Sequence, residues 1–503
     1  MTVDVAIVGC GPVGAFLAGE LRLAGVRVVV LERSVEPTVH SRAFRLQTRT
    51  LELLDYRGLL DRFVANAIRI PKTHFAAIRP PLLDLDLLDT EHPYTLGIPQ
   101  ARTEAYLVEH AAGLGAEIRR GHEITGLEQT GDGVVLQVNS ADGPYSLTAA
   151  YVVGCDGGRS LVRKAAGIGF PGVPGTVSAL LGDVTLGDPD AFPSGIPGTL
   201  RTRSGLIMAV AMPDTGIRVF TCEFDRPVPD RDAPVSLDEL RAAATRVTGL
   251  EIEMSEPTWL ARFTDSSRLV DRFHSGRVFV AGDAAHVHFP IGAQGLNLGI
   301  QDAMNLGWKL AGQIHGWAPG DLLDSYDRER RPAADRVILE TRAQLALMNS
   351  DERIDPLREV FRELLAIDEV NRHLSRMLTG LDARYQPEPT AAVHPLVGRL
   401  APPLRLRTAA GPVRLAELLR TGRPVLVDLG DEPSVATAAA GHRDRVDVIA
   451  AREEDGATVG ALLIRPDGYV AWAAAPDVAP AAVESSLPAA LAAWFGLATA
   501  AVR

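Results

Sequence analysis

Val3-Asp4-Val5-Ala6-Ile7-Val8-Gly9-Cys10-Gly11-Pro12-Val13-Gly14 is the stretch that decides the fold. A short run rich in β-branched residues ends in a glycine turn, and the segment from Ala15 to Leu23 that follows is helical in pattern. Gly25 then precedes a second apolar run, Val26 to Leu31, which ends at Glu32. Strand, turn, helix, strand and acid form one βαβ unit of a parallel sheet, so the sequence predicts an α/β fold.

The glycine turn predicts a dinucleotide site. Gly9-x-Gly11-x-x-Gly14 supplies a tight turn, a close approach of backbone to a pyrophosphate, and close packing of helix on strand. The start of the helix that follows presents unpaired N–H groups and a positive dipole end to that anion. Glu32 can accept hydrogen bonds from both ribose hydroxyls of an adenosine and would repel a 2′-phosphate. The ligand is therefore FAD or NAD rather than NADP, with a purely structural turn as the alternative.

A second pattern, further along the chain, favours FAD over NAD. The apolar run Val278 to Ala281 is followed directly by Gly282 and Asp283, and Pro290 to Asn297 then opens a helix. Asp283 can accept hydrogen bonds from ribityl hydroxyls. The N–H groups of Gly295 to Asn297 can stabilise the negative charge that a reduced isoalloxazine carries near N1 and C2=O. The structural alternative is a surface strand-to-helix turn.

A third element, Tyr151 to Ser160, again places an acid and glycines after a strand. Asp156 and Arg159 either orient backbone against the flavin or meet a nicotinamide cofactor. A capped turn explains this stretch equally well, so both interpretations stay open.

Composition limits the function classes. With 503 residues the chain suggests about three domains. Lys and Arg number 51 against 63 Asp and Glu, so the net charge of −12 argues against nucleic acid or an anionic membrane as the main partner. Cys10, Cys155 and Cys222 cannot build a disulfide framework or a thiolate metal cluster, which points to a reducing cytoplasm.

The pattern of strands and turns divides the chain. Residues 1–73, 99–175 and 265–394 are expected to form one discontinuous nucleotide-binding domain. From about Val177 to Phe263, strands alternate with Gly/Pro turns, which indicates an inserted mixed or antiparallel sheet. We expect the strand-like segment His74 to Pro99 to join it, so the second domain comprises residues 74–98 and 176–264. A proline-rich connector precedes a separate α/β unit, residues 395–503, with a hairpin turn at Arg465-Pro466-Asp467-Gly468.

Three helices are expected outside the first βαβ unit. They cover Thr103 to Leu114, Leu296 to Ile314, and Leu322 to Met348, and Pro332 predicts a kink or a break in the last of them.

With these motifs in place, the chain resembles the group A FAD-dependent aromatic monooxygenases, the family of p-hydroxybenzoate and phenol hydroxylases. The glycine fingerprint, the Asp-Gly motif and the Gly-Asp motif occur in the family's order and near its spacing. Other stretches look like the aromatic polyketide hydroxylases of angucycline and anthracycline biosynthesis: Glu20 to Val26, Arg119 to Glu123, Gly154 to Ser160 and Gln301 to Leu310. The likeness extends over nearly the whole chain.

The resemblance implies a fold. It consists of a Rossmann-like, p-hydroxybenzoate hydroxylase-like FAD-binding domain, an inserted mixed-sheet substrate domain and a C-terminal thioredoxin-like domain. That last domain has no Cys-x-x-Cys, because every cysteine precedes it, so disulfide exchange is excluded and a packing or dimer-support role is preferred.

Residue roles follow from the same resemblance. Gly11, Gly14, Glu32 and Arg33 would hold the adenosine diphosphate half, Arg42 would reach the flavin or its phosphates, and Gln100, assisted by Arg102, would lie on the ribityl side. Asp283 would bind the linker, and Leu296 and Asn297 would meet the pyrimidine edge of the ring. The full set of expected cofactor-binding residues is Gly9, Gly11, Pro12, Val13, Gly14, Glu32, Arg33, Arg42, Gln100, Arg102, Ile124, Asp156, Asp283, Pro290, Gly292, Gly295, Leu296 and Asn297.

On the substrate side we expect Phe44, Arg45, Gln47 and Pro290, with no catalytic side chain assigned because the chemistry is centred on the flavin. Two departures from the family pattern flank the flavin face: Phe289 stands where many relatives have proline, and Ala293 where many have glycine.

In the family, NAD(P)H reduces the flavin, oxygen adds to give a C4a-hydroperoxide, and a phenolic ring attacks the distal oxygen. The implied function is hydroxylation of a polycyclic aromatic polyketide with FAD, NADPH or NADH, and O2. A Baeyer–Villiger or ring-opening outcome, a flavin-holding scaffold without turnover, and an NAD dehydrogenase are the alternatives. No metal is expected, since His286 and His288 lack an evident third ligand. A homodimer stays open.

Overall fold

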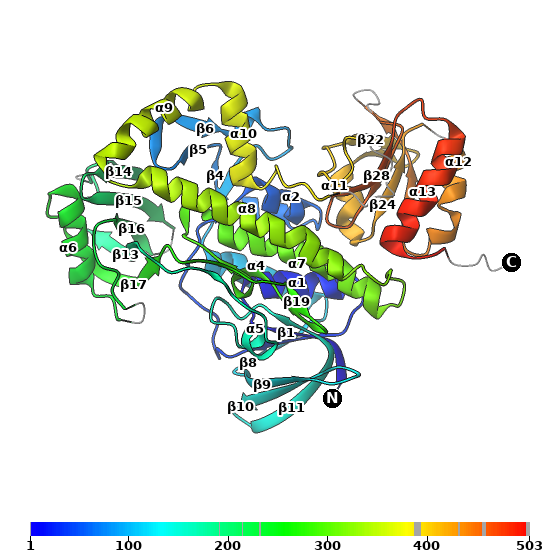
Figure 1. Cartoon of the computed structure of the whole chain (residues 1–503), viewed down its shortest axis with the longest axis horizontal. Coiled ribbons are helices and arrows are strands. Elements are labelled where there is room, and N and C mark those ends of the chain that lie inside the picture. Colours follow the sequence, from blue (N-terminus) through cyan, green and yellow to red (C-terminus); the bar gives the residue numbers. More distant parts are fainter. Residues whose placement is uncertain are drawn as a thin grey trace.

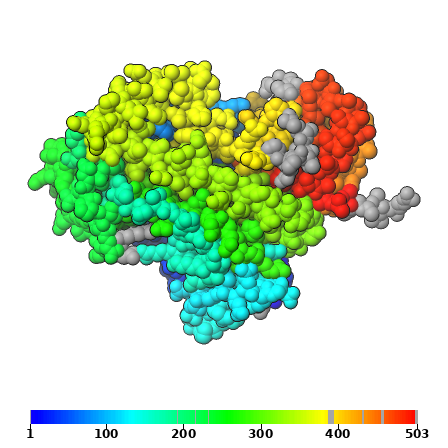
Figure 2. Space-filling model, viewed as in Figure 1, coloured from blue at the N-terminus to red at the C-terminus, as the bar shows by residue number. Residues whose placement is uncertain are grey.

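The computed structural model describes residues 2–190, 192–213, 215–230, 233–386, 394–430, 433–454 and 459–498. A central α/β lobe carries an inserted sheet at one end and a C-terminal lobe at the other (Figure 1). The space-filling view shows the same arrangement, with the C-terminal lobe in orange and red and the inserted sheet in green (Figure 2). No helix within the described ranges is long and apolar enough to cross a membrane.

The predicted βαβ unit forms the centre of the main sheet. β1 (Thr2–Val8) pairs in parallel with β2 (Val28–Glu32) and with β11 (Gly143–Gly154). β8 (Glu117–Arg120) extends the parallel sheet beyond β2, and β20 (Val278–Val280) extends it beyond β11. Antiparallel strands complete it: β9 (Glu123–Gln129), β10 (Val134–Ser140) and β19 (His274–Ser275).

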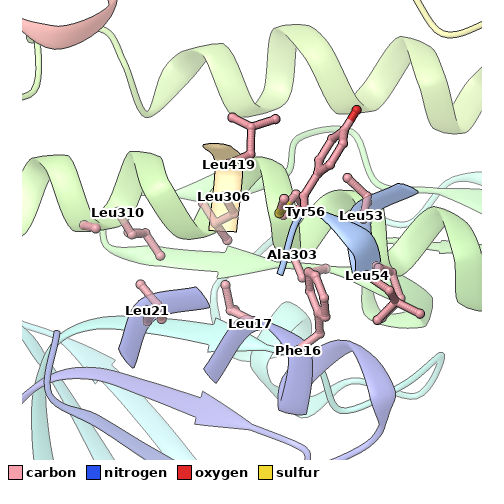
Figure 3. Packing of buried hydrophobic residues seen from close by; sticks show 14 of the residues in the cluster. Phe16, Leu17, Leu21, Leu53, Leu54, Tyr56, Ala303, Leu306, Leu310 and Leu419 are labelled. Atoms are coloured by element: carbon pink, nitrogen blue, oxygen red, sulfur yellow. The ribbon is translucent and has the colours of Figure 1, made fainter. Parts of the chain in front are cut away.

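Two helices that begin at the candidate cofactor motifs pack directly on each other. α1 (Pro12–Leu23) and α7 (Gln294–Ile314) share an apolar core to which α2 (Thr48–Asp55) also contributes, as Phe16, Ala303 and Leu54 show (Figure 3). A Cβ placed on Gly299 of α7 would lie 2.6 Å from the Val13 side chain and 3.0 Å from Gly282 Cα. The starts of both helices and the end of β20 therefore meet in one place.

The inserted sheet is antiparallel throughout, as expected for a mixed or antiparallel sheet. Its order is β14–β15–β16–β13–β17. The strands are β13 (Ser178–Leu186), β14 (Gly198–Thr202), β15 (Gly205–Met212), β16 (Gly216–Glu223) and β17 (Met254–Thr264), and α6 (Leu237–Thr248) packs against them.

The expectation that His74 to Pro99 joins this sheet is wrong. β5 (Lys72–Phe75) and β6 (Ile78–Asp84) pair only with each other, and β7 (Thr95–Gly97) pairs with β3 (Arg45–Leu46) and β4 (Ile68–Ile70). The hairpin reaches the inserted sheet through side chains instead, because Phe75 and Ile78 share an apolar cluster with Ala179. Side chains take the place of a further strand at its outer edge, because Asn371 of α10 accepts from the backbone N–H of Asp84 and donates to the carbonyl of Leu82.

The long helix α8 (Asp324–Met348) is continuous, so Pro332 does not break it. Two of the expected helices begin earlier than predicted. α4 covers Gln100–Gly113 and was expected from Thr103, and α7 begins at Gln294 and was expected from Leu296. α9 (Asp355–Leu365) and α10 (Asp368–Thr379) then cover the β5–β6 hairpin. The remaining short elements of the main lobe are α3 (Leu60–Val64), α5 (Leu161–Ala165), β12 (Gly172–Val173), β18 (Ser267–Leu269) and β21 (His286–Val287).

The C-terminal lobe is thioredoxin-like, as the resemblance implied. Its sheet runs β25–β24–β27–β28, with β24 parallel to β25 and antiparallel to β27. These strands are β24 (Val425–Asp428), β25 (Asp447–Ala450), β27 (Ala461–Ile464) and β28 (Val470–Ala474), and the turn at Arg465–Gly468 joins the last two as predicted. Around them lie α11 (Leu415–Leu418), α12 (Pro433–Ala438), α13 (Pro480–Phe495), β22 (Arg405–Thr408), β23 (Gly411–Arg414) and β26 (Arg452–Glu453).

Candidate active site

The three glycines of the first motif do different work. Gly9 has φ of +102°, and a Cβ there would lie 2.4 Å from the carbonyl oxygen of Cys155. A Cβ on Gly14 would lie 2.1 Å from the carbonyl oxygen of Gly9, which confirms close packing of helix on strand. A Cβ on Gly11 would meet no heavy atom within 4 Å. Gly11 caps α1 without a side-chain hydrogen bond, so this open face and its N–H groups fit a pyrophosphate.

Glu32 is held in place by the glycine turn itself. Its Oε2 accepts a hydrogen bond from the backbone N–H of Cys10 at 2.8 Å, and its Oε1 accepts one from Ser34 at 2.9 Å. A carboxylate has about four lone-pair directions, so two remain for ribose hydroxyls. Arg33 beside it is exposed. The carboxylate is thus aimed before any ligand arrives.

Asp283 is the exposed residue of a one-turn helix that follows β20, and its neighbours Gly282 and Ala284 are buried. A buried acid holds this turn in place. Asp302 of α7 is fully buried, and its Oδ2 accepts hydrogen bonds from the backbone N–H of Gly282 at 3.1 Å and pairs with His286 Nε2 at 2.7 Å. Its Oδ1 accepts from Arg330 Nε at 2.8 Å. Burial acts to raise the pKa of Asp302, but His286 and Arg330 outweigh it and hold the pKa below its usual value.

The turn before α7 has an unusual backbone. Gly292 has φ of +71° and Ala293 has φ of +56°, so both lie in the left-handed region. An alanine there costs about 1 kcal/mol relative to glycine. α7 begins at Gln294 without a side-chain cap, so its first N–H groups have no partner within the helix. This is the arrangement that a flavin's negatively charged edge requires.

The side chain of Asn297 hydrogen-bonds to protein partners through both its oxygen and its nitrogen, and the contact with the ring that the resemblance implies stays a prediction. Its Oδ1 accepts from the backbone N–H of Gln47 at 2.8 Å and from Thr50 Oγ1 at 2.7 Å. Its Nδ2 donates to the carbonyls of Arg45 at 3.1 Å and Ala293 at 2.7 Å. Only the backbone N–H of Asn297 is left for the predicted contact.

Residues 41–47 form hydrogen bonds to α7 through Asn297, to α4 and to the inserted sheet. Gln100 exchanges hydrogen bonds with Ala43, at 3.1 Å through its side-chain oxygen and at 3.0 Å through its backbone N–H. Arg218 of the inserted sheet, paired with Asp183, donates to the carbonyl of Ser41 at 2.5 Å. Arg42 is exposed at this junction. The predicted flavin-side loop is therefore set by the main lobe and the inserted sheet together.

Three of the expected substrate-side residues, Phe44, Arg45 and Gln47, lie on the same segment, whereas Pro290 is exposed at the turn before α7. Arg45 Nη1 donates to Thr73 Oγ1 at 2.7 Å, and among the residues described here it forms no ion pair with a carboxylate. Burial lowers the pKa of its guanidinium. Phe44 packs against Gly97, and Gln47 Nε2 donates to the carbonyl of Gly292 at 2.5 Å. Arg45 is therefore a partly buried cation that has no carboxylate partner within the described part of the chain.

Three of the expected cofactor residues make other contacts. Asp156 Oδ2 accepts from the N–H groups of Leu161 at 2.7 Å and Val162 at 3.2 Å, so it caps α5, as the capped-turn interpretation requires. Ile124 is buried in the apolar cluster on β9, and Arg102 donates to the carbonyl of Asn66 at 3.3 Å. A contact of these three residues with a cofactor stays a prediction.

Comparison with known proteins follows the same division of the chain. The family model described as "FAD binding domain" matches residues 2–341, and the model described as "Aromatic-ring hydroxylase, C-terminal" matches residues 394–498. The chain belongs to the FAD-binding aromatic-ring hydroxylases. It is an FAD-dependent monooxygenase that uses NAD(P)H as reductant, as its relatives are.

Relatives in this hydroxylase family match along the whole chain. The 12-dehydrotetracycline 5-monooxygenase/anhydrotetracycline 6-monooxygenase of Streptomyces rimosus is 46% identical over 508 residues, covering 99% of both chains. A solved aromatic hydroxylase from angucycline biosynthesis is 41% identical with a TM-score of 0.90, again over 99% of both chains. The dialkyldecalin synthase of Streptomyces rugosporus is 42% identical over 497 residues, 99% of each. The resemblance to aromatic polyketide hydroxylases is confirmed.

Two functional features of the hydroxylase were not predicted from its sequence: the role of Asp302 and the side-chain hydrogen bonds of Asn297. Asp302 could have been suspected, because it is the one acid in α7 and its neighbours are apolar or amide residues. The bonds of Asn297 carry no local signal, since their partners lie some 250 residues earlier in the chain.

Among the described residues, one group of three side chains could hold a metal ion: Asp55, Glu91 and His92. Arg414 donates to Asp55 at 2.7 Å and to Glu91 at 3.0 Å, so the hydroxylase uses these acids to hold its C-terminal lobe. His286 and His288 are not part of that group, and His286 pairs with Asp302 instead.

Proposed function

We propose that the protein hydroxylates a polycyclic aromatic polyketide, using FAD, NADPH or NADH, and O2. One observation carries the assignment of the site: the starts of α1 and α7 and the end of β20 meet where Val13, Gly282 and Gly299 touch. A single extended cofactor can therefore lie along Gly11, past Asp283, to the amides before Asn297. When bound, FAD supplies electron transfer and oxygen activation.

The protein's own contribution is positioning and electrostatics. The unpaired N–H groups at the start of α7 stabilise negative charge on the pyrimidine edge of the ring. Arg45 offers a positive charge, lacking a carboxylate partner among the described residues, to the phenolate oxygen of an aromatic substrate. One oxygen atom of O2 then enters the ring and the other leaves as water, with two electrons taken from NAD(P)H.

Aromatic side chains support an aromatic substrate. Phe289, next to the flavin-side turn, packs edge-on against Phe220 of the inserted sheet with ring centroids 6.0 Å apart. Trp259 and Phe263 of β17 lie partly buried against the same apolar cluster. Phe289 and Phe220 are themselves buried, so Trp259 and Phe263 are the rings on which a polycyclic substrate would stack. The substrates in the name of the tetracycline relative are of this chemical class, and the solved relative is an aromatic hydroxylase from angucycline biosynthesis.

Product analysis tests the proposal. The protein is incubated with FAD, NADPH, ¹⁸O2 and candidate polycyclic ketides, and products are examined by mass spectrometry and NMR. Hydroxylation predicts one labelled oxygen on an intact ring system. An inserted oxygen that opens or enlarges a ring indicates the Baeyer–Villiger alternative. NAD(P)H oxidation that the aromatic ligand stimulates excludes a scaffold without turnover. A rearranged product without labelled oxygen would indicate an activity like that of the dialkyldecalin synthase and contradict the proposal.

We also propose a cytoplasmic location and a homodimer. Cys10, Cys155 and Cys222 are all free thiols, which suits a reducing compartment. Light scattering on the purified protein measures the oligomeric state directly.

A further inference from the structure

A cavity of about 570 Å³ reaches the flavin-side turn from within the helical layer. It lies between α7, α8, the end of α10 and residues 380–386. Gln294 and Asn297 line its inner end, whereas Gly11, Asp283 and Pro290 do not line it. Of the expected cofactor-binding residues, Asn297 alone is among the described residues that line this cavity, so the cavity meets the proposed cofactor site at the start of α7.

Gln294 and Glu340 form a buried polar pair beside this cavity. Each side chain is 4% exposed, and Gln294 Nε2 donates to Glu340 Oε2 at 3.3 Å. Gln294 Oε1 and Glu340 Oε1 both lack a hydrogen-bond partner among the described residues. Arg336 Nε lies 2.8 Å from Glu340 Oε1, but without the alignment of a hydrogen bond. Each side chain of this pair thus keeps one buried oxygen without a hydrogen bond, and a proton on Glu340 would supply the donor that the pair lacks.

The charges around Glu340 favour its neutral form. Burial and the nearby Asp382 raise the pKa of Glu340 to about 8, against the opposing effect of Arg336 on the same helix. α7 contributes only uncharged residues to this cavity: Gln294, Asn297, Leu298 and Gln301. α10 contributes Met377, Leu378 and Thr379. Besides Glu340, the charged residues that line the cavity are Arg328, Glu329, Arg336, Asp382 and Arg384. Arg336 is 45% exposed, so solvent weakens its pairing.

A neutral acid suits this position for a geometric reason. Gln294 is the first residue of α7 and follows Gly292 and Ala293, which both hold left-handed backbone. Such a turn persists only where its surroundings hold it. A protonated carboxyl offers one donor and one acceptor, which match the two ends of a primary amide. An ionised carboxylate offers acceptors only, so it cannot donate a hydrogen bond to the amide oxygen.

We propose that Glu340 is a positioning residue which, as the neutral acid, holds the flavin-side turn through Gln294, and that its ionisation makes the flavin harder to reduce. The inference rests on the cofactor placement proposed above. A reduced flavin carries negative charge at the edge that faces this turn, so a second negative charge behind the turn opposes reduction.

The test is the pH dependence of the flavin's midpoint potential. Holoenzyme is titrated anaerobically from pH 6 to 9.5 with a reference dye, without aromatic substrate. In the wild-type protein, we expect the potential to fall more steeply with pH from about pH 8 upward. Glu340→Gln keeps the donor and the acceptor but cannot ionise. In this variant we expect the same midpoint potential as the wild type at pH 6.5 and no steeper fall of the potential above about pH 8.

Glu363→Gln is the matched control, because it makes the same chemical change on the exposed face of α9 and should keep the steeper limb. The inference is overturned if the midpoint potentials of wild type and Glu340→Gln change with pH in parallel. It is also overturned if the steeper fall above about pH 8 is still present in Glu340→Gln. The titration contains neither oxygen nor polyketide, so a failure of the hydroxylation proposal is detected by the product assay alone.

Discussion

Asn297 Oδ1 accepts a hydrogen bond at 2.8 Å from the backbone N–H of Gln47, a residue 250 positions earlier in the chain. Through this bond, the start of α7 holds the segment that carries Phe44 and Arg45. The ring side and the substrate side of the proposed site are thus joined by one buried amide, so a change at Asn297 should disturb both.

Asn297→Ala should weaken FAD binding at least tenfold and lower the free energy of unfolding by about 2–4 kcal/mol, because it leaves several buried polar groups without partners. Fluorescence titration of the apoprotein and urea unfolding measure the two effects. Leu339→Ala, at an exposed position on α8, is the control and should change neither. Wild-type FAD affinity in Asn297→Ala would show that the residue does not organise the cofactor site.

Gly11→Ala and Gly14→Ala should separate ligand binding from folding. A Cβ on Gly11 meets no protein atom, so the variant should lose less than about 1 kcal/mol of stability but bind FAD at least tenfold more weakly. A Cβ on Gly14 lies 2.1 Å from a carbonyl oxygen, so that variant should lose about 2–3 kcal/mol. Thermal unfolding with and without FAD distinguishes them. If Gly11→Ala binds FAD as tightly as the wild type, the pyrophosphate lies elsewhere.

Arg45→Met should lower kcat/KM for the aromatic substrate by about 10- to 100-fold, since it removes a charge-assisted contact to a phenolate. Its bound FAD should keep the wild-type spectrum and the wild-type rate of reduction by NADPH without substrate. Stopped-flow reduction and steady-state oxygen consumption give these values. Arg45→Lys retains the charge and should recover part of the activity. Equal losses in substrate-free reduction would assign Arg45 to the cofactor instead.

Stability should fall in acid partly because of Glu329. Burial acts to raise the pKa of Glu329, but Arg465 and Lys309 outweigh it and lower the pKa to about 2. A carboxyl whose folded pKa is depressed stabilises the protein above its unfolded pKa, near 4.5, and loses that contribution as the pH falls toward 2. Urea unfolding between pH 6 and 2.5 measures this.

Glu329→Gln should be less stable at pH 6, because Arg465 and Lys309 then lack their carboxylate, and its stability should fall less between pH 4.5 and 2.5. The exposed Glu363→Gln should follow the wild-type curve. Parallel curves for Glu329→Gln and wild type would show that this carboxyl does not contribute to the acid sensitivity.

Local patterns predicted the central fold well. The strand from Val3, the turn through Gly14 and the strand ending at Glu32 are specified by neighbouring residues, and the structure contains each of them. The hairpin turn at Arg465–Gly468 was visible for the same reason. Turn chemistry and strand periodicity act within a few residues, so one sequence displays them.

Partners distant in the chain were not visible. The segment His74 to Pro99 is strand-like, but the choice between the inserted sheet and a hairpin of its own depends on packing that only the fold defines. Likewise, nothing near Glu340 in the sequence points to Gln294, 46 residues away. For Asp156, the sequence left a capped turn and a cofactor contact open. The hydrogen bond of Asp156 to the N–H of Leu161 shows that it caps α5.

The turn at Arg465–Gly468 has a consequence for engineering chimeras. Arg465 pairs with Glu329 of α8 at 2.5 Å, while Arg49 and Arg57 of the main lobe donate to the carbonyls of Asp467 and Pro466. These charges are buried. If the C-terminal lobe is exchanged between related enzymes, these buried charges lose their partners unless the recipient has the same arginines and glutamate. A chimera must therefore keep the residues on both sides of this contact.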